Sequence, residues 1–228
     1  MTIVLFGIST VRNDLKKFPR LFIYFYELFE IWRKVWYNVN RIGVGGENMR
    51  ERIQAWDDRM LMRIAKRHTP LMNRIMIMIT SSGNNGLIWF ALAVPMLLMN
   101  RWRLMGFTVL AAMGIATLTG EITTKHIVKR VRPCNKAFDE YLLIENPPHY
   151  SFPSGHTTAS FAVAAVIMIM CPTIYTPVVL YAAMISLSRL YLLVHYPTDV
   201  LAGIVIGTVC GLVSIPIAQF IPLFSIQF

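Results

Sequence analysis

Long apolar runs separated by short polar breaks dominate the chain from residue 71 onward. A hydrocarbon core of about 30 Å takes about 20 helical residues to cross, so the last four runs are plausible membrane spans. The first two are shorter and are separated by SSGNNG, a turn-forming sequence, so we expect a tight helical hairpin there. The pattern predicts six membrane-spanning helices, from the runs 71–82, 86–100, 104–124, 156–171, 174–194 and 199–218.

The first 70 residues follow a different pattern, in which charged side chains recur among apolar and aromatic ones. The charges of residues 19–39 repeat at three- and four-residue spacings, so they share one helical face. This is typical of an amphipathic helix that lies in the membrane interface. Residues 47–67 form a second charged and helical stretch. We therefore divide the chain into an amphipathic N-terminal helical arm, 1–70, and a six-helix membrane domain, 71–228.

Composition agrees with this division. The 228 residues are 55% hydrophobic and only 15% charged, with a mean hydropathy of +0.51, whereas about a quarter of a soluble domain is charged. An all-α integral membrane protein is predicted, with no cleaved signal peptide because the first residues lack a charged stretch and a cleavage site. Cys134, Cys171 and Cys210 have no CxxC spacing and are interpreted as core residues, so no disulfide, metal or cofactor is expected.

The positive charge is concentrated near the N-terminus. Of 22 Lys and Arg residues, 13 precede residue 68, and only Arg189 follows Lys136. With no basic and aromatic platform on a soluble domain, the net charge of +10 indicates contact with anionic lipid headgroups and no nucleic-acid partner. No oligomeric state is predicted.

Charge also predicts the orientation in the plasma membrane. The basic arm and the short loop around Arg101 and Arg103 are expected on the cytoplasmic side. Counting six spans from there places residues 125–155 and 189–199 together on the extracytoplasmic face. Polar residues far apart in the sequence are therefore expected to form one site on that face.

The first polar cluster is KHIVKRVRP, residues 125–133. Lys125, Lys129 and Arg132 are spaced i, i+4 and i+7, so they are predicted to share a helical face. Glu121 lies one turn before Lys125 and is expected to form a salt bridge that orients the lysine. Taken alone, the cluster is also typical of an ordinary helix end stabilised by cations.

The second cluster is the sequence PSGH at the start of the fourth apolar run. Ser154 is predicted to cap a helix that begins at Gly155 and His156. A helix N-terminus presents free N–H groups and a partial positive charge, which together bind an anion. Gly155 allows close approach of a ligand, and His156 can transfer a proton near neutral pH. A capped helix start with an interfacial histidine is the simpler interpretation.

The third cluster is SRLYLLVHYPTD, residues 188–199. Arg189 lies at the end of an apolar helix, where an unpaired charge is costly. His195 and Asp199 are four residues apart across a new helix start, so we expect the carboxylate to hold one imidazole nitrogen. The alternative is an interfacial arginine and histidine that reach toward water. Further along, Gly203, Gly207 and Gly211 form a small-residue stripe that predicts close helix packing.

Together the three clusters predict a phosphoryl-transfer site. Cations and helix N–H groups neutralise phosphate oxygens. One histidine can attack phosphorus and the other can protonate the leaving oxygen, with the carboxylate orienting the nucleophile. The residues by themselves do not decide which histidine attacks, although the neighbouring Asp199 favours His195. With few carboxylates available, no metal is expected.

The pattern K-x6-RP, PSGH and SR-x5-H-x3-D resembles the signature of the type 2 phosphatidic acid phosphatase superfamily. The matching residues are Lys125, Arg132, Pro133, the stretch 153–156, Ser188, Arg189, His195 and Asp199, with no departure, and the resemblance covers about residues 71–218. It implies a six-helix membrane enzyme that hydrolyses lipid phosphates or diphosphates without a metal. It also implies that His195 is the nucleophile, Asp199 its partner and His156 the general acid. Phosphate would be held by Lys125, Arg132, Ser154, Gly155 and Arg189.

The expected substrate is a lipid phosphate at the outer leaflet, either a polyprenyl diphosphate such as undecaprenyl diphosphate or a phospholipid such as phosphatidylglycerophosphate or phosphatidate. The outward site and small size favour the polyprenyl substrate slightly. A lipid phosphotransferase with the same site is the alternative. A vanadate-dependent haloperoxidase is disfavoured by the six apolar runs, and a non-catalytic lipid-binding relative by the presence of both His156 and His195.

Overall fold

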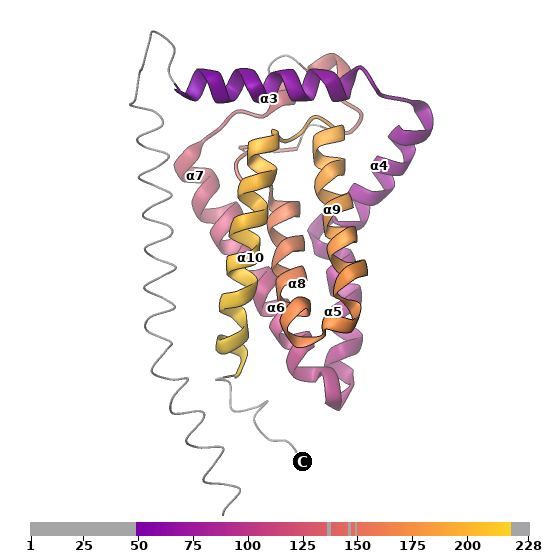
Figure 1. The fold of residues 1–228 in the computed structure, drawn as a ribbon, viewed down its shortest axis with the longest axis vertical. Coiled ribbons are helices and arrows are strands. Elements are labelled where there is room, and N and C mark those ends of the chain that lie inside the picture. The colour runs from indigo at the N-terminus through magenta and orange to yellow at the C-terminus, as the bar shows by residue number, and fades with distance from the viewer. Residues whose placement is uncertain (1–48, 136–137, 146, 149, 220–228) are drawn as a thin grey trace, which may run out of the picture. The chain divides into compact units, whose positions relative to one another are not determined.

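The computed structural model describes residues 49–135, 138–145, 147–148 and 150–219 (Figure 1). The amphipathic stretch predicted at residues 19–39 lies outside the described residues. The chain divides into two compact units, 1–55 and 56–228, and the second contains all the motifs. All regular structure in the described ranges is helical, as predicted.

Six α-helices follow the predicted apolar runs closely: α4 (Pro70–Ser82), α5 (Leu87–Leu98), α6 (Arg103–Thr117), α8 (Gly155–Met170), α9 (Tyr175–Tyr191) and α10 (Pro197–Gln219). Helix α3 (Met49–Ala65) lies in the charged stretch before them, and α7 (Lys125–Val128) is a single short turn. A π-helical segment, η3 (Leu118–Thr124), joins α6 to α7. Short 3-10 turns connect the rest: η1 (Asn84–Gly86), η2 (Asn100–Trp102), η4 (Pro133–Asn135), η5 (Asp139–Tyr141) and η6 (Pro172–Ile174).

The predicted hairpin at residues 71–100 is wrong. The chain bends by only 51° between α4 and α5, so the two helices continue in one general direction as a broken helix. Asn85 (φ 51°) and Gly86 (φ +72°) adopt left-handed backbone conformations, which interrupt the helix without reversing the chain. SSGNNG is therefore a break inside one apolar segment and not a loop between two.

Three helical segments of the described chain are long and apolar enough to cross a membrane: Asn100–Asn135, Pro172–Tyr191 and Pro197–Gln219. The bent pair α4 and α5 becomes a fourth if it counts as one span. The remaining apolar helix, α8, has only 16 residues. The protein is thus an all-helical integral membrane protein, but the six-span count is not confirmed, because it counted α4 and α5 separately.

Helix α8 is the centre of the bundle and packs against α6, α9 and α10 (Figure 1). The glycine stripe of α10 faces it, as predicted. A Cβ atom on Gly207 would lie 2.2 Å from the carbonyl oxygen of Thr158, and one on Gly211 would lie 2.3 Å from that of Ala162. These backbones touch directly, so α8 and its N-terminal residues are held rigidly against α10.

Helix α3 contributes to the end of the bundle that carries the motifs. Asp57, Leu61 and Ala65 recur every four residues and are buried. Leu61 and Ala65 pack against Leu193 and Tyr196, which flank His195. The junction of α5 and α6, with its two arginines, lies at the opposite end of the bundle (Figure 1).

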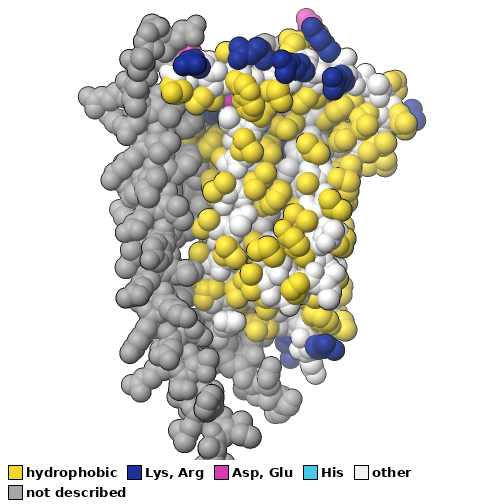
Figure 2. All heavy atoms as spheres, in the orientation of Figure 1, with side chains coloured by type: hydrophobic (Ala, Val, Ile, Leu, Met, Phe, Trp, Pro, Cys, Tyr) yellow, Lys and Arg dark blue, Asp and Glu magenta, His cyan; other side chains and the backbone are white. Residues whose placement is uncertain are grey.

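The sequence predicts that the basic arm and the loop around Arg101 and Arg103 lie on one face of the membrane and the motifs on the other. For residues 57–65 of the arm this prediction is wrong, because they pack at the end of the bundle that carries the motifs. The count of Lys and Arg residues could not reveal this, because α3 makes its contacts through the buried stripe of Asp57, Leu61 and Ala65. Lys and Arg side chains are visible at both ends of an otherwise largely apolar surface (Figure 2).

Candidate active site

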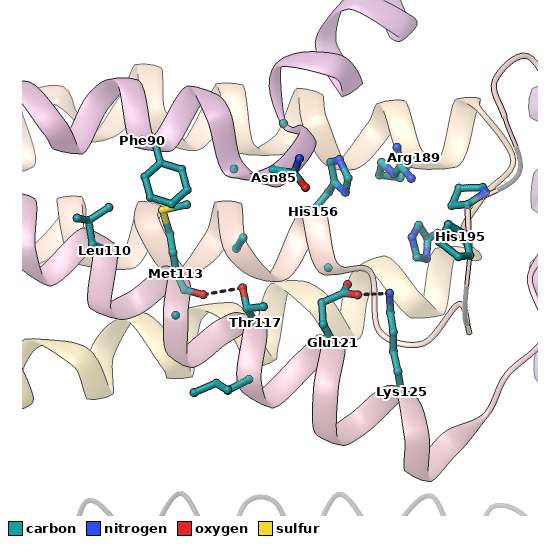
Figure 3. A pocket seen from close by; sticks show the side chains of 18 of the residues that line it. Asn85, Phe90, Leu110, Met113, Thr117, Glu121, Lys125, His156, Arg189 and His195 are labelled. Carbon is teal, nitrogen blue, oxygen red and sulfur yellow. Dashed lines mark hydrogen bonds and ion pairs between the residues drawn. The ribbon is translucent and has the colours of Figure 1, made fainter.

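A pocket of about 780 Å³ lies between the helices and contains most of the predicted site residues (Figure 3). One end is polar and holds His156, Arg189 and His195, and the other is apolar and runs between α5 and α6. The polar end is lined by Glu121, Lys125, Arg132, Pro147, Pro148, Gly155, His156, Arg189 and His195, and the apolar end includes Phe90, Leu110, Met113, Gly114, Thr117 and Leu118.

Lys125 is placed by the π-helical segment η3 and the short helix α7. Its side chain is buried, and Nζ lies 2.6 Å from Oε2 of Glu121. The predicted salt bridge is thus confirmed. π-Helical turns occur frequently at functional sites, and here the segment directs two charged side chains into the pocket.

The shared helical face predicted for Lys125, Lys129 and Arg132 is wrong. Helix α7 ends at Val128, and Lys129 adopts a left-handed conformation with φ 50°. The side chain of Lys129 is exposed and does not line the pocket. Arg132 reaches the pocket from the segment after the helix.

Three hydrogen bonds of Arg132 fix its guanidinium in the pocket. Nη1 donates to the carbonyl of Val194 at 3.0 Å and to Nε2 of His195 at 3.1 Å, and Nη2 donates to the carbonyl of Pro148 at 3.1 Å. The motif arginine therefore meets the motif histidine directly, although they are 63 residues apart in the chain.

PSGH begins a helix as predicted, with Gly155 as the first residue of α8, but Ser154 occupies the N-cap position without a side-chain capping hydrogen bond. The hydroxyl of Ser154 accepts a hydrogen bond from Thr157 Oγ1 at 3.0 Å, and its N–H donates to the carbonyl of Asp199 at 3.1 Å. Ser154 is fully buried and, unlike Gly155 and His156, does not line the pocket. In this structure it ties α8 to α10.

His156 faces the pocket from the first turn of α8 (Figure 3). Its Nε2 lies 3.0 Å from Oδ1 of Asn84, to which it donates a hydrogen bond. A Cβ on Gly83 would lie 3.0 Å from the imidazole ring, so the helix break also packs against it. Sequence reasoning missed Asn84, although SSGNNG was visible as a polar interruption.

Arg189 enters the pocket from the last turn of α9 and is buried. Its Nη1 donates a hydrogen bond to Thr80 of α4. Within the described residues its Nε is buried and has no hydrogen-bond partner. The motif cation is thus held between two helices that are distant in the chain.

His195 lies in the buried loop between α9 and α10, and its two ring nitrogens have different partners. Nδ1 lies 2.7 Å from the carbonyl oxygen of Ser151, which can only accept, so Nδ1 carries the proton of the neutral ring. Nε2 then accepts from Arg132 and keeps its lone pair on the pocket side. Burial, and next the charge of Arg132, lowers the pKa of His195 well below its ordinary value of 6.5.

Asp199 does not hold the imidazole as predicted. Its Oδ2 lies 3.7 Å from Nδ1 of His195, within ion-pair range but longer than a hydrogen bond. The same oxygen accepts from the N–H of Tyr196 at 2.9 Å. The Ser151 carbonyl fixes the tautomer, and Asp199 fixes the loop.

A second ion network lies behind Asp199. Nη1 of Arg130 binds Oδ1 of Asp199 at 2.8 Å, and Nη2 binds Oδ2 of Asp57 at 2.6 Å. The guanidinium also lies 3.9 Å from the centre of the Tyr196 ring. Neither Arg130 nor Asp57 was singled out from the sequence. The signal for Asp57 was its position on the same four-residue stripe as Leu61, where an acid has to be paired.

This arrangement can bind and transfer an anionic group. The motif cations Lys125, Arg132 and Arg189 surround a neutral histidine, and the free N-terminal N–H groups of α8 lie beside them. Water-poor surroundings strengthen such interactions. The apolar end of the same pocket extends away from the charges.

Comparison with known proteins identifies the family. The PAP2 superfamily model matches residues 101–221. An undecaprenyl-diphosphatase of Sulfolobus acidocaldarius is 29% identical over 157 residues, covering 68% of this chain and 75% of that protein. A decaprenylphosphoryl-5-phosphoribose phosphatase of Mycobacterium tuberculosis is 37% identical over 110 residues, covering 48% of this chain and 57% of the relative, so the chain spans little more than half of its length.

A solved structure shows the same fold. The transmembrane PAP2-type phosphatidylglycerolphosphate phosphatase of Bacillus subtilis is 23% identical and superposes with a TM-score of 0.62, covering 90% of this chain and 97% of that one. The family model covers more than half of the chain and includes all three motifs, so the chain belongs to the PAP2 superfamily.

Proposed function

We propose that this membrane phosphatase of the PAP2 superfamily hydrolyses a phosphate ester of a lipid through a phosphohistidine at His195. One observation carries the proposal: Nε2 is the unprotonated ring nitrogen of His195, and together with Arg132, from which it accepts a hydrogen bond, it lies at a pocket that joins three cations to an apolar channel. A neutral imidazole is the nucleophilic form, and the lowered pKa of His195 keeps it neutral at physiological pH.

The reaction proceeds in two balanced steps. With the anionic substrate bound, His156 carries a proton on both ring nitrogens. The Nε2 lone pair of His195 attacks phosphorus while the bond from phosphorus to the lipid-side oxygen breaks, and His156 donates its Nδ1 proton to that oxygen. Water then attacks phosphorus, the bond from phosphorus to Nε2 breaks, and Nδ1 of His156 takes a proton from the water. Inorganic phosphate and the dephosphorylated lipid leave. Lys125, Arg132 and Arg189 neutralise the phosphoryl oxygens throughout.

The partner of His156 supports its role as the acid. Nε2 is occupied by Asn84, so Asn84 orients the ring, and the other nitrogen is the one that exchanges a proton with the substrate. Among the described residues, no three His, Cys, Asp or Glu side chains come together as a metal site would require. The proposed mechanism uses no metal.

The apolar end of the pocket supports a lipid as the substrate. Phe90, Leu110 and Met113 line it and lie well away from the charged groups (Figure 3). Polyprenyl diphosphates, phosphatidylglycerophosphate and phosphatidate all combine a phosphate headgroup with an apolar chain. The names of the relatives span the same range, from an undecaprenyl diphosphatase to a phosphatidylglycerolphosphate phosphatase.

The site is proposed to open on the extracytoplasmic face of the plasma membrane. The α5–α6 junction, with Arg101 and Arg103, lies at the opposite end of the bundle, and short basic loops are retained in the cytoplasm. Arg59 and Arg63 lie on the part of α3 that packs at the same end as the site, so the positive charges at the two ends predict opposite orientations. The orientation is tested with single cysteines at positions 101 and 140, in a background without the native cysteines. In intact cells, an impermeant thiol reagent should label position 140 and not position 101. Labelling of position 101 alone contradicts the proposed orientation.

The function is tested by phosphate release from the purified protein in detergent. Polyprenyl diphosphate, phosphatidylglycerophosphate and phosphatidate are compared side by side. We expect His195→Ala to abolish release, whereas His126→Ala, at an exposed histidine outside the pocket, keeps it. Substrate labelled with ³²P should leave an acid-labile phosphohistidine on the wild type and none on His195→Ala. Transfer of the label to another lipid instead of water would favour the phosphotransferase.

A further inference from the structure

One acidic side chain lies inside the cationic end of the pocket. Glu121 projects from the π-helical segment, and Oε2 binds Lys125. Its other oxygen faces the start of α8: a Cβ on Gly155 would lie only 1.8 Å from Oε1. The carboxylate therefore lies against the helix N-terminus, beside the place where phosphate is proposed to bind. Its side chain remains 37% exposed to the pocket.

Glu121 also lies between the two ends of the pocket. Along the α6–η3 segment, Met113, Thr117, Glu121 and Lys125 follow one another from the apolar end to the cationic end (Figure 3). A phosphate held by Lys125 and attacked by His195 has its lipid side directed toward Thr117 and Met113. The group attached to phosphorus on that side passes Glu121.

That group differs between the two substrate classes. In a phosphate monoester it is a neutral ester oxygen, followed by carbon. In a diphosphate it is a second phosphate, which carries its own negative charge. A carboxylate at this position tolerates the first and repels the second, because like charges in a water-poor site repel strongly.

The charge balance of the pocket leads to the same result. Lys125, Arg132 and Arg189 supply three positive charges, and Glu121 removes one. The remaining two match a phosphate monoester, whose charge is roughly −1.5 to −2 at neutral pH. A diphosphate adds a further negative charge that the pocket lining does not neutralise.

We propose that Glu121 is a specificity-determining residue that adapts the site to lipid phosphate monoesters and disfavours diphosphates. The inference rests on the proposed lipid phosphatase function and narrows its substrate class. It reverses the preference for a polyprenyl diphosphate that the sequence favoured slightly.

The test compares two substrates with the same chain, farnesyl phosphate and farnesyl diphosphate. Initial rates of phosphate release give the ratio of kcat/KM values for the wild type, Glu121→Gln and Glu121→Asp. We expect the wild type to favour the monophosphate at least tenfold. Glu121→Gln should reduce this ratio at least tenfold, chiefly by raising kcat/KM for the diphosphate, and Glu121→Asp should retain most of it. The matched control Glu140→Gln changes an exposed acid outside the pocket and should leave the ratio unchanged.

A ratio is insensitive to a general loss of active protein, so partial misfolding does not imitate the expected result. A wild type that favours the diphosphate, or a Glu121→Gln ratio within twofold of wild type, overturns the proposal.

Binding provides a readout that needs no turnover. Calorimetric titration with orthophosphate and pyrophosphate should show that Glu121→Gln gains more affinity for pyrophosphate than for orthophosphate. If the wild type releases no phosphate from the two farnesyl substrates, from phosphatidylglycerophosphate or from phosphatidate, the proposed function fails. An unchanged ratio of the two dissociation constants refutes the charge selection separately.

Discussion

The buried ion network behind His195, the proposed nucleophile, leads to a sharp prediction for Arg130→Gln. The side chain of Arg130 is 10% exposed, and those of Asp57 and Asp199 are fully buried. The guanidinium is the shared counterion of the two carboxylates, one from α3 and one from α10. Glutamine retains part of the volume and removes the charge, so two buried carboxylates lose their common cation.

The expected loss of stability is large. Removing one partner of a buried ion pair costs about 3–5 kcal/mol. In a protein of this size, 1 kcal/mol corresponds to roughly 2–4 °C in melting temperature, so Arg130→Gln should lower Tm by roughly 6–20 °C. Asp57→Asn should cost less, about 1.5–3 kcal/mol, because it removes charge-assisted hydrogen bonds but leaves the Arg130–Asp199 pair intact.

The assay is thermal unfolding in detergent at one scan rate, with kcat and KM measured at a temperature where each variant is folded. Because Asp199 holds the loop that carries His195, we expect Arg130→Gln to lower kcat at least tenfold with little change in KM. Arg130→Lys should restore only part of the activity, since an ammonium group cannot bridge both carboxylates as the planar guanidinium does.

A double-mutant cycle separates coupling from general damage. The combined variant with Asp57→Asn and Arg130→Gln should be more stable than the sum of the single losses predicts, by about 0.5–3 kcal/mol. Arg63→Gln, on the exposed side of α3, is the matched control and should change Tm by no more than a degree or two. If Arg130→Gln melts like this control and keeps its kcat, the network does not support the site and the reasoning is refuted.

Three further predictions concern packing, pH and the general acid. Gly207→Ala should destabilise the protein by about 1–3 kcal/mol, because its Cβ would meet a carbonyl oxygen of α8 at 2.2 Å. The control Gly114→Ala, whose Cβ meets nothing within 4 Å, should be neutral or stabilising by up to about 1 kcal/mol. Equal melting temperatures of the two variants would contradict the described packing of α10 on α8. Since the pKa of His195 is lowered from 6.5, the acid limb of the kcat/KM profile due to the nucleophile should lie well below pH 6.5, and a midpoint at or above 6.5 would count against it. Because the pKa of His195 is lower in the folded than in the unfolded protein, the unfolded state takes up the proton at a higher pH. The contribution of His195 to the free energy of unfolding should therefore fall as pH drops below 6.5. Unfolding measured at a series of pH values tests this. Asn84→Ala should lower kcat about tenfold with an unchanged KM by freeing the ring of His156, and an unaffected kcat would show that the hydrogen bond plays no part in turnover.

Much of the site could be predicted because its chemistry is carried by rare residue types at short spacings. Charged and histidine residues in apolar surroundings are costly unless they are used, so Lys125, Arg189 and His195 were visible without any structure. The Lys125–Glu121 salt bridge and the packing of Gly207 followed from local helical periodicity. The start of α8 at Gly155 was predicted from the capping preference of the serine before it, although the Ser154 side chain makes no capping hydrogen bond in the structure.

What the sequence could not decide depends on which segments meet in space. SSGNNG predicts an interruption whether the chain reverses or merely bends, and only the packing of α4 and α5 against their neighbours selects the 51° bend, which brings Asn84 to His156. The proton on Nδ1 of His195 is determined by the carbonyl of Ser151, and backbone carbonyls have no signature in a sequence. Asp57 and Arg130 are 73 residues apart, so their pairing appears only when α3 packs across the loop. The sequence thus determined by itself which polar residues are candidates for the reacting groups. The tertiary structure decided their orientation, because orientation depends on contacts between distant segments that no local pattern encodes.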